Sequence, residues 1–232
     1  MYPEICLQSF VDNWWIENEN RDYRIGRLLW AFIPHIDQVP ATLTPEGRKE
    51  PTNHNTAKYR IEPLRANNPS KTPLLPVAAL PSYPGEFRVV YRAKKRPVLV
   101  ISSGGVDIPK TLRQGFPKWQ TSPTILVAPF YGADKIGYRA GWPQKLIDRI
   151  QRCEYPQYLW DKLPIHTETE ESILRLDQIQ PIGKHHFSLD WTKHRLSDKA
   201  ITLLQEQITW LLWEGLPEDG DFLEIRELLL TL

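Results

Sequence analysis

The chain has 232 residues, of which 41% are hydrophobic and 25% charged, so it is long enough to fold around one large core or two small ones. Its formal net charge of +1 excludes a broad positive field for nucleic acid, although a local basic patch such as "YRAKKRP" is compatible with it. That patch is more simply a solvated turn. No apolar run is long enough to cross a bilayer and no signal sequence is visible, so we expect a cytoplasmic protein without membrane contact.

The first half of the chain contains few regular patterns. Residues 1–23 are expected to form a helical extension, because "EICLQSFVDNWWIEN" spaces its apolar residues at about one helical turn. Residues 34–85 hold ten of the 21 prolines and have no helical or strand period, which predicts a long loop inserted into the main domain. Short extended pieces such as "PLLPVAAL" would pin this loop. Cys6 and Cys153 stand in no metal-binding spacing and predict reduced packing thiols.

The rest of the chain predicts strands followed by helices. Five short runs are rich in β-branched and aromatic residues: 24–34, 96–102, 124–130, 157–163 and 172–182. Helices are expected at 143–153, at 197–213 with Ser197 as the N-cap and Gly215 closing the end, and from Asp219 or Asp221 onward within 214–232. This order indicates a mainly β domain over 24–213, a small antiparallel barrel or sandwich with appended helices.

One predicted strand contains an ion pair. In "ESILRLDQIQPIG" the alternation of a strand places Arg175 and Asp177 on the same face, between Ile173 and Ile179. A solvated surface ion pair is the more common explanation of such a pattern. A catalytic pair is the alternative, and the residues alone do not decide between the two.

Four motifs in order resemble the PemK/MazF/Kid family of toxins. The motifs are "GRLLWAFIP", "RPVLVIS", "VAPFYG" and "LRLDQIQPI", the last followed by a long helix, and together they cover about 24–33 and 96–213. The resemblance implies an SH3-like antiparallel barrel with a C-terminal helix, and a homodimer. It also implies a metal-independent endoribonuclease that needs no cofactor, and an antitoxin peptide that blocks its RNA groove.

The resemblance also implies roles for individual residues. Asp177 would accept the proton of a ribose 2′-hydroxyl as it attacks the adjacent phosphorus, while Arg175 and Arg96 would stabilise the charge that develops on the phosphate. Arginine holds its proton too firmly to act as a general acid. The substrate contacts expected around this centre are Lys95, Ser102, Tyr131 and Gln178, with single-stranded RNA as the partner, and we expect no metal site.

The sequence departs from the family pattern in two places. Tyr131 stands where active members have a small hydroxyl residue, and the loop that usually precedes the Arg-Pro motif is replaced by the insertion. His185, His186 and His194 follow the Arg-Asp strand without the spacing of metal ligands. A second hypothesis is therefore a catalytically degenerate scaffold that binds a partner protein or peptide. In a third, the resemblance concerns the fold alone.

Overall fold

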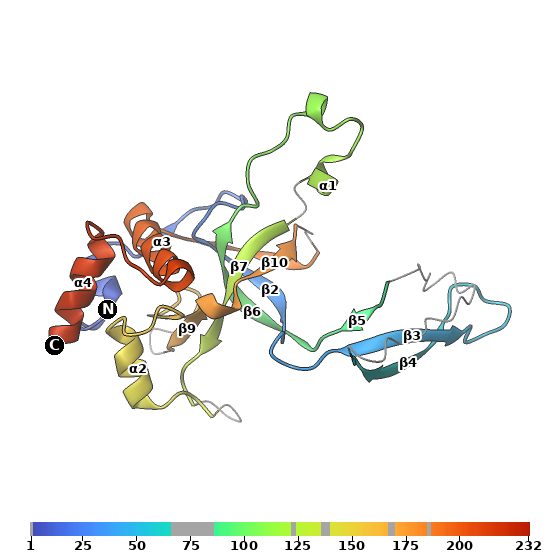
Figure 1. Ribbon diagram of the computed structural model, residues 1–232, viewed down its shortest axis with the longest axis horizontal. Coiled ribbons are helices and arrows are strands. Elements are labelled where there is room, and N and C mark those ends of the chain that lie inside the picture. The colour runs from blue at the N-terminus through green and yellow to red at the C-terminus, as the bar shows by residue number, and fades with distance from the viewer. Residues whose placement is uncertain (1, 66–85, 122–123, 136–139, 167–169, 185–186) are drawn as a thin grey trace. The chain divides into compact units, whose positions relative to one another are not determined.

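The protein divides into two compact units, which we describe separately. The computed structural model describes residues 2–65, 86–121, 124–135, 140–166, 170–184 and 187–232. Unit 1 consists of Met1–Phe32 and Lys95–Leu232, and unit 2 of Ile33–Lys94. Their elements are labelled in Figure 1.

Unit 2 contains a small sheet, and two of its strands lie within residues 34–85, which were expected to form a loop. Its described strands are β3 (Ala41–Gly47), β4 (Lys58–Pro63) and β5 (Val89–Val90), in the antiparallel order β4-β3-β5. Leu43 faces Ile61 and Pro45 faces Tyr59 across the β3–β4 pair, so this hairpin has one apolar face. Pro45 is accommodated beside a register shift, where a missing ladder donor costs little. The segment "PLLPVAAL" lies outside the described residues.

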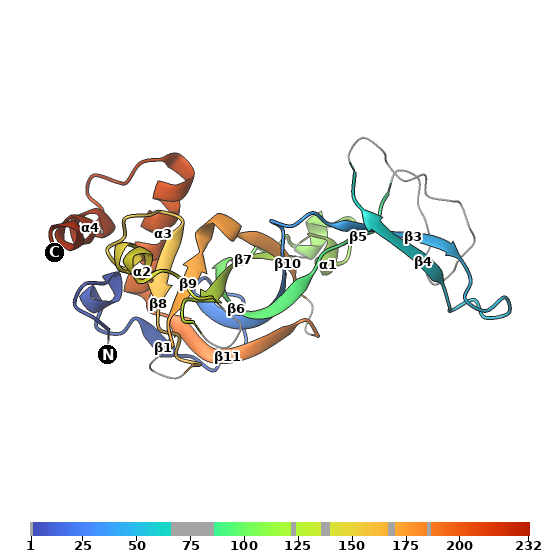
Figure 2. The same cartoon turned by 90° about the horizontal axis from the view of Figure 1, so that it is seen from below.

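Unit 1 is built on an antiparallel sheet, which confirms the mainly β prediction. Its described strands are β1 (Trp15–Glu17), β2 (Arg27–Pro34), β6 (Ala93–Ser102), β7 (Thr124–Gly132), β8 (Tyr158–Asp161), β9 (Ser172–Arg175), β10 (Gln180–Gly183) and β11 (Leu189–Leu196). The order is β1-β11-β2-β6-β7-β9-β8, with β10 also paired to β7. Figure 2 shows β11 curving beside its partner β1. Among the described strands no pairing joins β1 to β8, so a closed SH3-like barrel is not found.

The predicted strand at 172–182 is interrupted, and this correction matters for the site. Residues Leu176–Gln178 form a 3-10 turn, η3, between β9 and β10. Ile173 of β9 faces Tyr131 of β7, whereas Gln180 of β10 faces Val127. An uninterrupted register would place Gln180 opposite Thr124, so the turn takes up three residues. Strand alternation therefore does not fix the direction of Asp177, which projects from η3 instead.

Three longer helices pack on unit 1 (Figure 1). They are α2 (Gln144–Gln151), α3 (Asp198–Trp213) and α4 (Asp221–Thr231), close to the predicted positions. The hydroxyl of Ser197 accepts a hydrogen bond from the Ala200 amide at 3.4 Å, which confirms the predicted cap. Leu203 and Leu204 of α3 are fully buried in the same cluster as Leu99 of β6. The left-handed residue that ends α3 is Glu214, at φ 58°, and not the expected Gly215.

The N-terminal segment is not the predicted helix. It forms a short 3-10 helix, η1 (Leu7–Phe10), and then the strand β1. The register of β1 sets Trp15 opposite Leu196 of β11. Successive tryptophans followed by isoleucine favour extended backbone, and a neighbouring strand edge satisfies that preference. Figure 2 shows this segment and the C-terminal end of α4 close together.

Two short helical elements complete the described part of unit 1. A 3-10 turn η2 (Lys110–Leu112) and the one-turn helix α1 (Lys118–Thr121) lie between β6 and β7.

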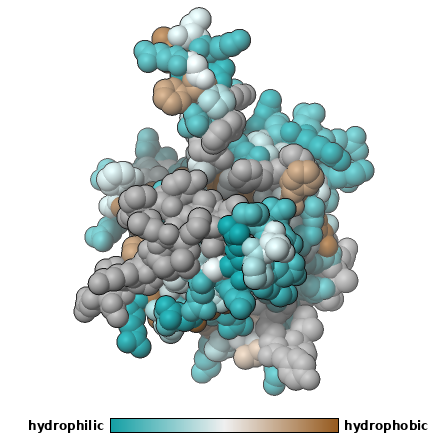
Figure 3. Space-filling view, turned by 90° about the vertical axis from the view of Figure 1, so that its right-hand side faces the viewer, coloured by the Kyte–Doolittle hydropathy of each residue, from teal (hydrophilic) through white to brown (hydrophobic). Residues whose placement is uncertain are grey.

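Within the described part of the chain, no helix is long and apolar enough to span a membrane. The face in Figure 3 is mostly hydrophilic where residues are described, and its apolar side chains form separate brown spots. Cys6 and Cys153 are free and buried, as predicted.

Candidate active site

Two arginines from different strands lie against one tyrosine ring. The guanidinium carbon of Arg96 is 3.9 Å from the centroid of the Tyr131 ring, and that of Arg175 is 5.7 Å from the same centroid. Both distances fall within the range of cation–π attraction. Residues 96, 131 and 175, separated in the sequence by loops and helices, thus meet in one place.

The sheet register explains why these residues meet. Val98 of β6 faces Pro129 of β7, and Arg96 and Tyr131 lie two positions beyond this pair in opposite chain directions. The two residues therefore project from the same face of neighbouring strands. On the other side of β7, Tyr131 faces Ile173, and Arg175 is the next residue of β9 on that face. Tyr131 lies between the two arginines because β7 lies between β6 and β9.

Asp177 is held by Arg175 through two hydrogen bonds. Nε of Arg175 donates to Oδ1 at 2.7 Å and Nη2 donates to Oδ2 at 2.5 Å, a bidentate arrangement. The bond to Asp177 raises the pKa of the Arg175 guanidinium above its usual value. The Asp177 side chain is 31% exposed and that of Arg175 21% exposed. The carboxylate is thus oriented by a cation and still accessible to a ligand.

The Tyr131 hydroxyl is directed at the same turn that holds Asp177. It donates a hydrogen bond of 2.6 Å to Oε1 of Gln178, which is nearly buried. Gln178 is the residue after Asp177 in η3, so the phenol and the carboxylate are both arranged around this one turn. We call Arg96, Tyr131, Arg175, Asp177 and Gln178 the arginine–tyrosine cluster.

Aromatic side chains continue the cluster toward α2. Tyr158 of β8 faces Arg175 in the sheet, and the Arg175 guanidinium carbon is 5.2 Å from the Tyr158 ring centroid. Tyr158 also contacts the rings of Trp142, at 5.4 Å, and Tyr155, at 6.3 Å. Cations and rings that alternate in this way are suited to planar bases and to phosphate, the two parts of single-stranded nucleic acid.

Two predicted substrate contacts lie apart from the cluster. Lys95 points to the face of β6 opposite that of Arg96 and forms an ion pair with Asp190 of β11. Ser102 is six residues along β6 from Arg96, roughly 20 Å at about 3.3 Å per residue, and its hydroxyl accepts from the Gly104 amide at 3.2 Å. Their positions argue against a direct role at Tyr131.

The histidines do not assemble into a metal site in the described residues. No group of three or more His, Cys, Asp or Glu side chains there could hold a metal ion. His194 lies on β11 opposite Glu17, and burial lowers its pKa. His185 and His186 lie outside the described residues.

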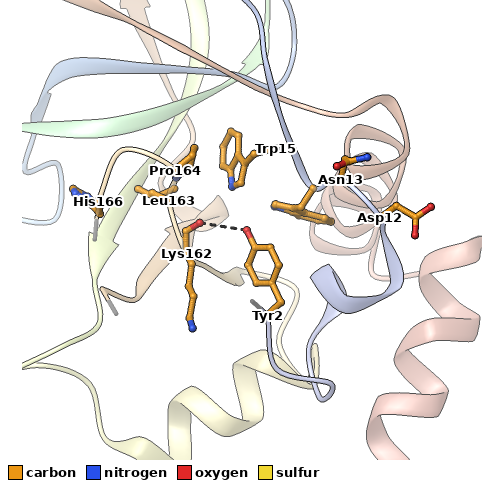
Figure 4. A pocket seen from close by; sticks show the side chains of 9 residues that line it. Tyr2, Asp12, Asn13, Trp15, Lys162, Leu163, Pro164 and His166 are labelled. Carbon is orange, nitrogen blue, oxygen red and sulfur yellow. Dashed lines mark hydrogen bonds between the residues drawn. The ribbon is translucent and has the colours of Figure 1, made fainter. Parts of the chain in front are cut away.

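A pocket lies beside the N-terminal segment of unit 1 (Figure 4). It has a volume of about 440 Å³ and is lined by Tyr2, Asp12, Asn13, Trp14, Trp15, Lys162, Leu163, Pro164 and His166. Figure 4 shows Tyr2 beside Lys162, and the Tyr2 hydroxyl is 3.3 Å from the Lys162 carbonyl oxygen that accepts from it. None of the predicted site residues lines this pocket.

Next to the pocket is a buried carboxylate with three neutral donors. The carboxylate of Asp161 accepts from the Tyr2 hydroxyl at 2.9 Å, from the Trp14 indole at 3.0 Å and from the Trp15 indole at 3.1 Å. Asp161 is 1% exposed, and this burial raises its pKa to about 7 although the three hydrogen bonds lower it. We call these four residues the Asp161 anchor, because they tie the N-terminal segment to β8.

The sequence reasoning missed Tyr158 and the Asp161 anchor. Both depend on pairing between segments whose register the sequence does not state. One signal was visible for the anchor: an aspartate directly after the apolar "YLW" run is costly to bury unless donors are provided elsewhere.

Comparison with known proteins adds no relative from which a role could be transferred. No protein-family model matches this sequence, and no curated protein matches it. The case for the arginine–tyrosine cluster therefore depends on its residues and their geometry.

Proposed function

We propose that this protein cleaves single-stranded RNA at the arginine–tyrosine cluster, by attack of a ribose 2′-hydroxyl on the adjacent phosphorus. The observation that supports this function is the meeting of Arg96 and Arg175 at one tyrosine ring, with the Asp177 carboxylate held by Arg175. Cleavage by this route needs a base for the 2′-hydroxyl and positive charge for the phosphorane oxygens. The cluster offers one accessible carboxylate and two guanidinium groups.

Each charged residue has a separate role in this proposal. Asp177 takes the proton from the 2′-hydroxyl, and the bidentate contact with Arg175 orients its carboxylate. Arg96 and Arg175 stabilise the negative charge that grows on the phosphate. The resemblance to the PemK/MazF/Kid toxins suggests the same division of labour without a metal ion. It also suggests a homodimer and a regulatory antitoxin that covers the cluster.

One observation favours a second candidate, a scaffold that binds a partner protein or peptide without cleaving RNA. The ring of Tyr131 occupies the space between two arginines, where a small hydroxyl residue would leave room for phosphate. Asp177 also engages two nitrogens of Arg175, which uses part of the hydrogen-bonding capacity of that guanidinium. A ligand that displaces neither the Tyr131 ring nor the Asp177 carboxylate would bind only at the rim of the arginine–tyrosine cluster.

The test is incubation of the purified chain with a defined single-stranded RNA in EDTA, followed by mapping of the new ends. We expect products that end in 2′,3′-cyclic phosphate. Asp177→Asn keeps the shape of the side chain but removes the base, and Arg175→Lys keeps the charge but loses the fork. Each substitution is expected to lower the cleavage rate about 10²-fold or more.

A matched control is Asp198→Asn. Asp198 forms an exposed ion pair with Arg195 at the start of α3, away from the cluster, so this variant should cleave RNA like the wild type. If wild-type protein leaves RNA intact, or if Asp177→Asn cleaves as fast as Asp198→Asn, the nuclease proposal is wrong. Pull-down of a partner that the Arg96→Ala variant fails to retain would then support the scaffold.

A further inference from the structure

We propose that Tyr131 is the general acid of the cleavage reaction, which donates its phenolic proton to the leaving 5′-oxygen. This inference rests on the proposed function and goes beyond it, because that function leaves the leaving group without a proton donor. A 5′-alkoxide is a poor leaving group in water, so its protonation contributes to the rate. Neither arginine can fill the role, because guanidinium does not release its proton near neutral pH.

The position of the phenol supports this role. The Tyr131 hydroxyl is the donor in its 2.6 Å hydrogen bond to Gln178, so its proton is directed toward η3. The same turn presents Asp177, the proposed base, as its exposed residue. An acid on β7 whose hydroxyl is directed at this turn, and a base carried by the turn itself, can address the two sides of a single phosphate, as in-line displacement requires.

Two positive charges lie beside the ring that would carry the negative charge after proton transfer. When the phenol gives up its proton it becomes an anion, and opposite charges within about 4–6 Å stabilise an anion. The Arg96 and Arg175 guanidinium groups lie 3.9 Å and 5.7 Å from the ring centroid. The nearly buried Gln178 amide fixes the direction of the hydroxyl. The phenol that replaces the small hydroxyl of the family motif thereby gains a function of its own.

The proton balance of the step is complete. Asp177 accepts the 2′-hydroxyl proton while the 2′-oxygen forms a bond to phosphorus. The bond between phosphorus and the 5′-oxygen breaks, and the 5′-oxygen takes the proton of Tyr131. The products are a 2′,3′-cyclic phosphate and a free 5′-hydroxyl. Exchange with water then returns the proton to the phenolate and removes the proton from Asp177.

The test compares two leaving groups at the bond that the mapping experiment identifies. One oligonucleotide has the natural 5′-oxygen there, and the other has a bridging 5′-sulfur, whose thiolate departs without protonation. Tyr131→Phe should slow cleavage of the oxygen substrate about 10²-fold or more, and should cleave the sulfur substrate within about fivefold of the wild-type rate. Tyr23→Phe is the matched control, because its ring packs on Trp191 and faces Lys184, outside the cluster.

Two further measurements separate acid catalysis from binding and folding. Affinity for an uncleavable analogue, with 2′-deoxyribose at the cleaved position, should be the same for Tyr131→Phe and wild type, and so should the melting temperature. An equal rate loss on both substrates, or no loss on either, overturns the role of Tyr131 while wild-type cleavage still supports the nuclease. Absence of wild-type cleavage overturns both proposals.

Discussion

Asp161 and Asp177 are two carboxylates of unit 1 in opposite situations. Asp161 is 1% exposed, and its hydrogen-bond donors Tyr2, Trp14 and Trp15 are neutral. The Asp177 side chain is 31% exposed and is held by a cation, Arg175. The first ties the N-terminal segment to β8, and the second remains able to meet a ligand.

The two carboxylates separate a perturbed pKa from access to a ligand. Strong shifts often mark functional sites, but structural networks also produce them. Here burial raises the pKa of Asp161 to about 7, and its oxygens are occupied by a tyrosine and two tryptophans. A reaction with a ligand also needs access, and the carboxylate of Asp177 is accessible whereas that of Asp161 is not.

The strongest test of this comparison removes the buried carboxylate. Asp161→Ala leaves one hydroxyl and two indole donors without their acceptor, at about 1–3 kcal/mol for each fully buried group. Because Tyr2 and Trp15 are only half-buried, we expect the free energy of unfolding to fall by about 2–5 kcal/mol in a urea titration. A loss below about 1 kcal/mol would show that the anchor does not hold the N-terminal segment.

A series of stability measurements at different pH values tests the raised pKa of Asp161. The pKa of Asp161 is raised from the ordinary 3.8 to about 7, so the folded state binds its proton more tightly than the unfolded chain does. The stabilisation from this group is therefore fully present below about pH 4 and is lost as the pH rises through about 7. Over that window it amounts to at most about 4–5 kcal/mol, at about 1.4 kcal/mol per pKa unit.

The measurement compares wild type with Asp161→Asn, which cannot titrate at this position. Urea titrations at pH 4, 5.5 and 7.5 should show the stability difference moving in favour of the wild type as the pH falls. The comparison cancels most of the contribution of other carboxylates. Parallel stability curves would mean that Asp161 is ionised in the fold throughout this range.

The smallest expected effect concerns the exposed carboxylate. Asp177→Asn breaks a partly exposed ion pair, which is worth about 0–1 kcal/mol, so its unfolding free energy should stay within about 1 kcal/mol of wild type. This variant combines a large expected loss of RNA cleavage with nearly full stability, whereas Asp161→Ala is expected to lose stability. A loss of several kcal/mol would give Asp177 the structural role that we assign to Asp161.

Local patterns predicted the helices and most strands of unit 1 because their causes lie within a few residues. The 197–213 helix needed only a serine cap and an apolar stripe, and both are visible in the sequence. The failed prediction at residues 1–23 has a distant cause. Trp14 and Trp15 are held by Asp161 and β1 pairs with β11, and neither partner is a sequence neighbour.

The site was predicted in its residue types and only partly in its geometry. Arg96, Arg175 and Asp177 were expected together because the resemblance to the PemK/MazF/Kid family implies a shared site for them. Lys95 was grouped with them by sequence proximity, although alternation along β6 sends it to the opposite face. Tyr131 was interpreted as a departure from the family motif. Its contacts with both arginines were not foreseen, because they depend on the register of three strands.

The sequence by itself determined which segments have an apolar face and which charged residues accompany the strand motifs, because these properties belong to short stretches of chain. Only the tertiary structure decided how β7 divides its pairing between β9 and β10, and hence where η3 turns Asp177 outward. It also decided that one aspartate is enclosed by tryptophans while another meets an arginine. Strand register and burial arise from contacts between distant residues, which no local pattern specifies.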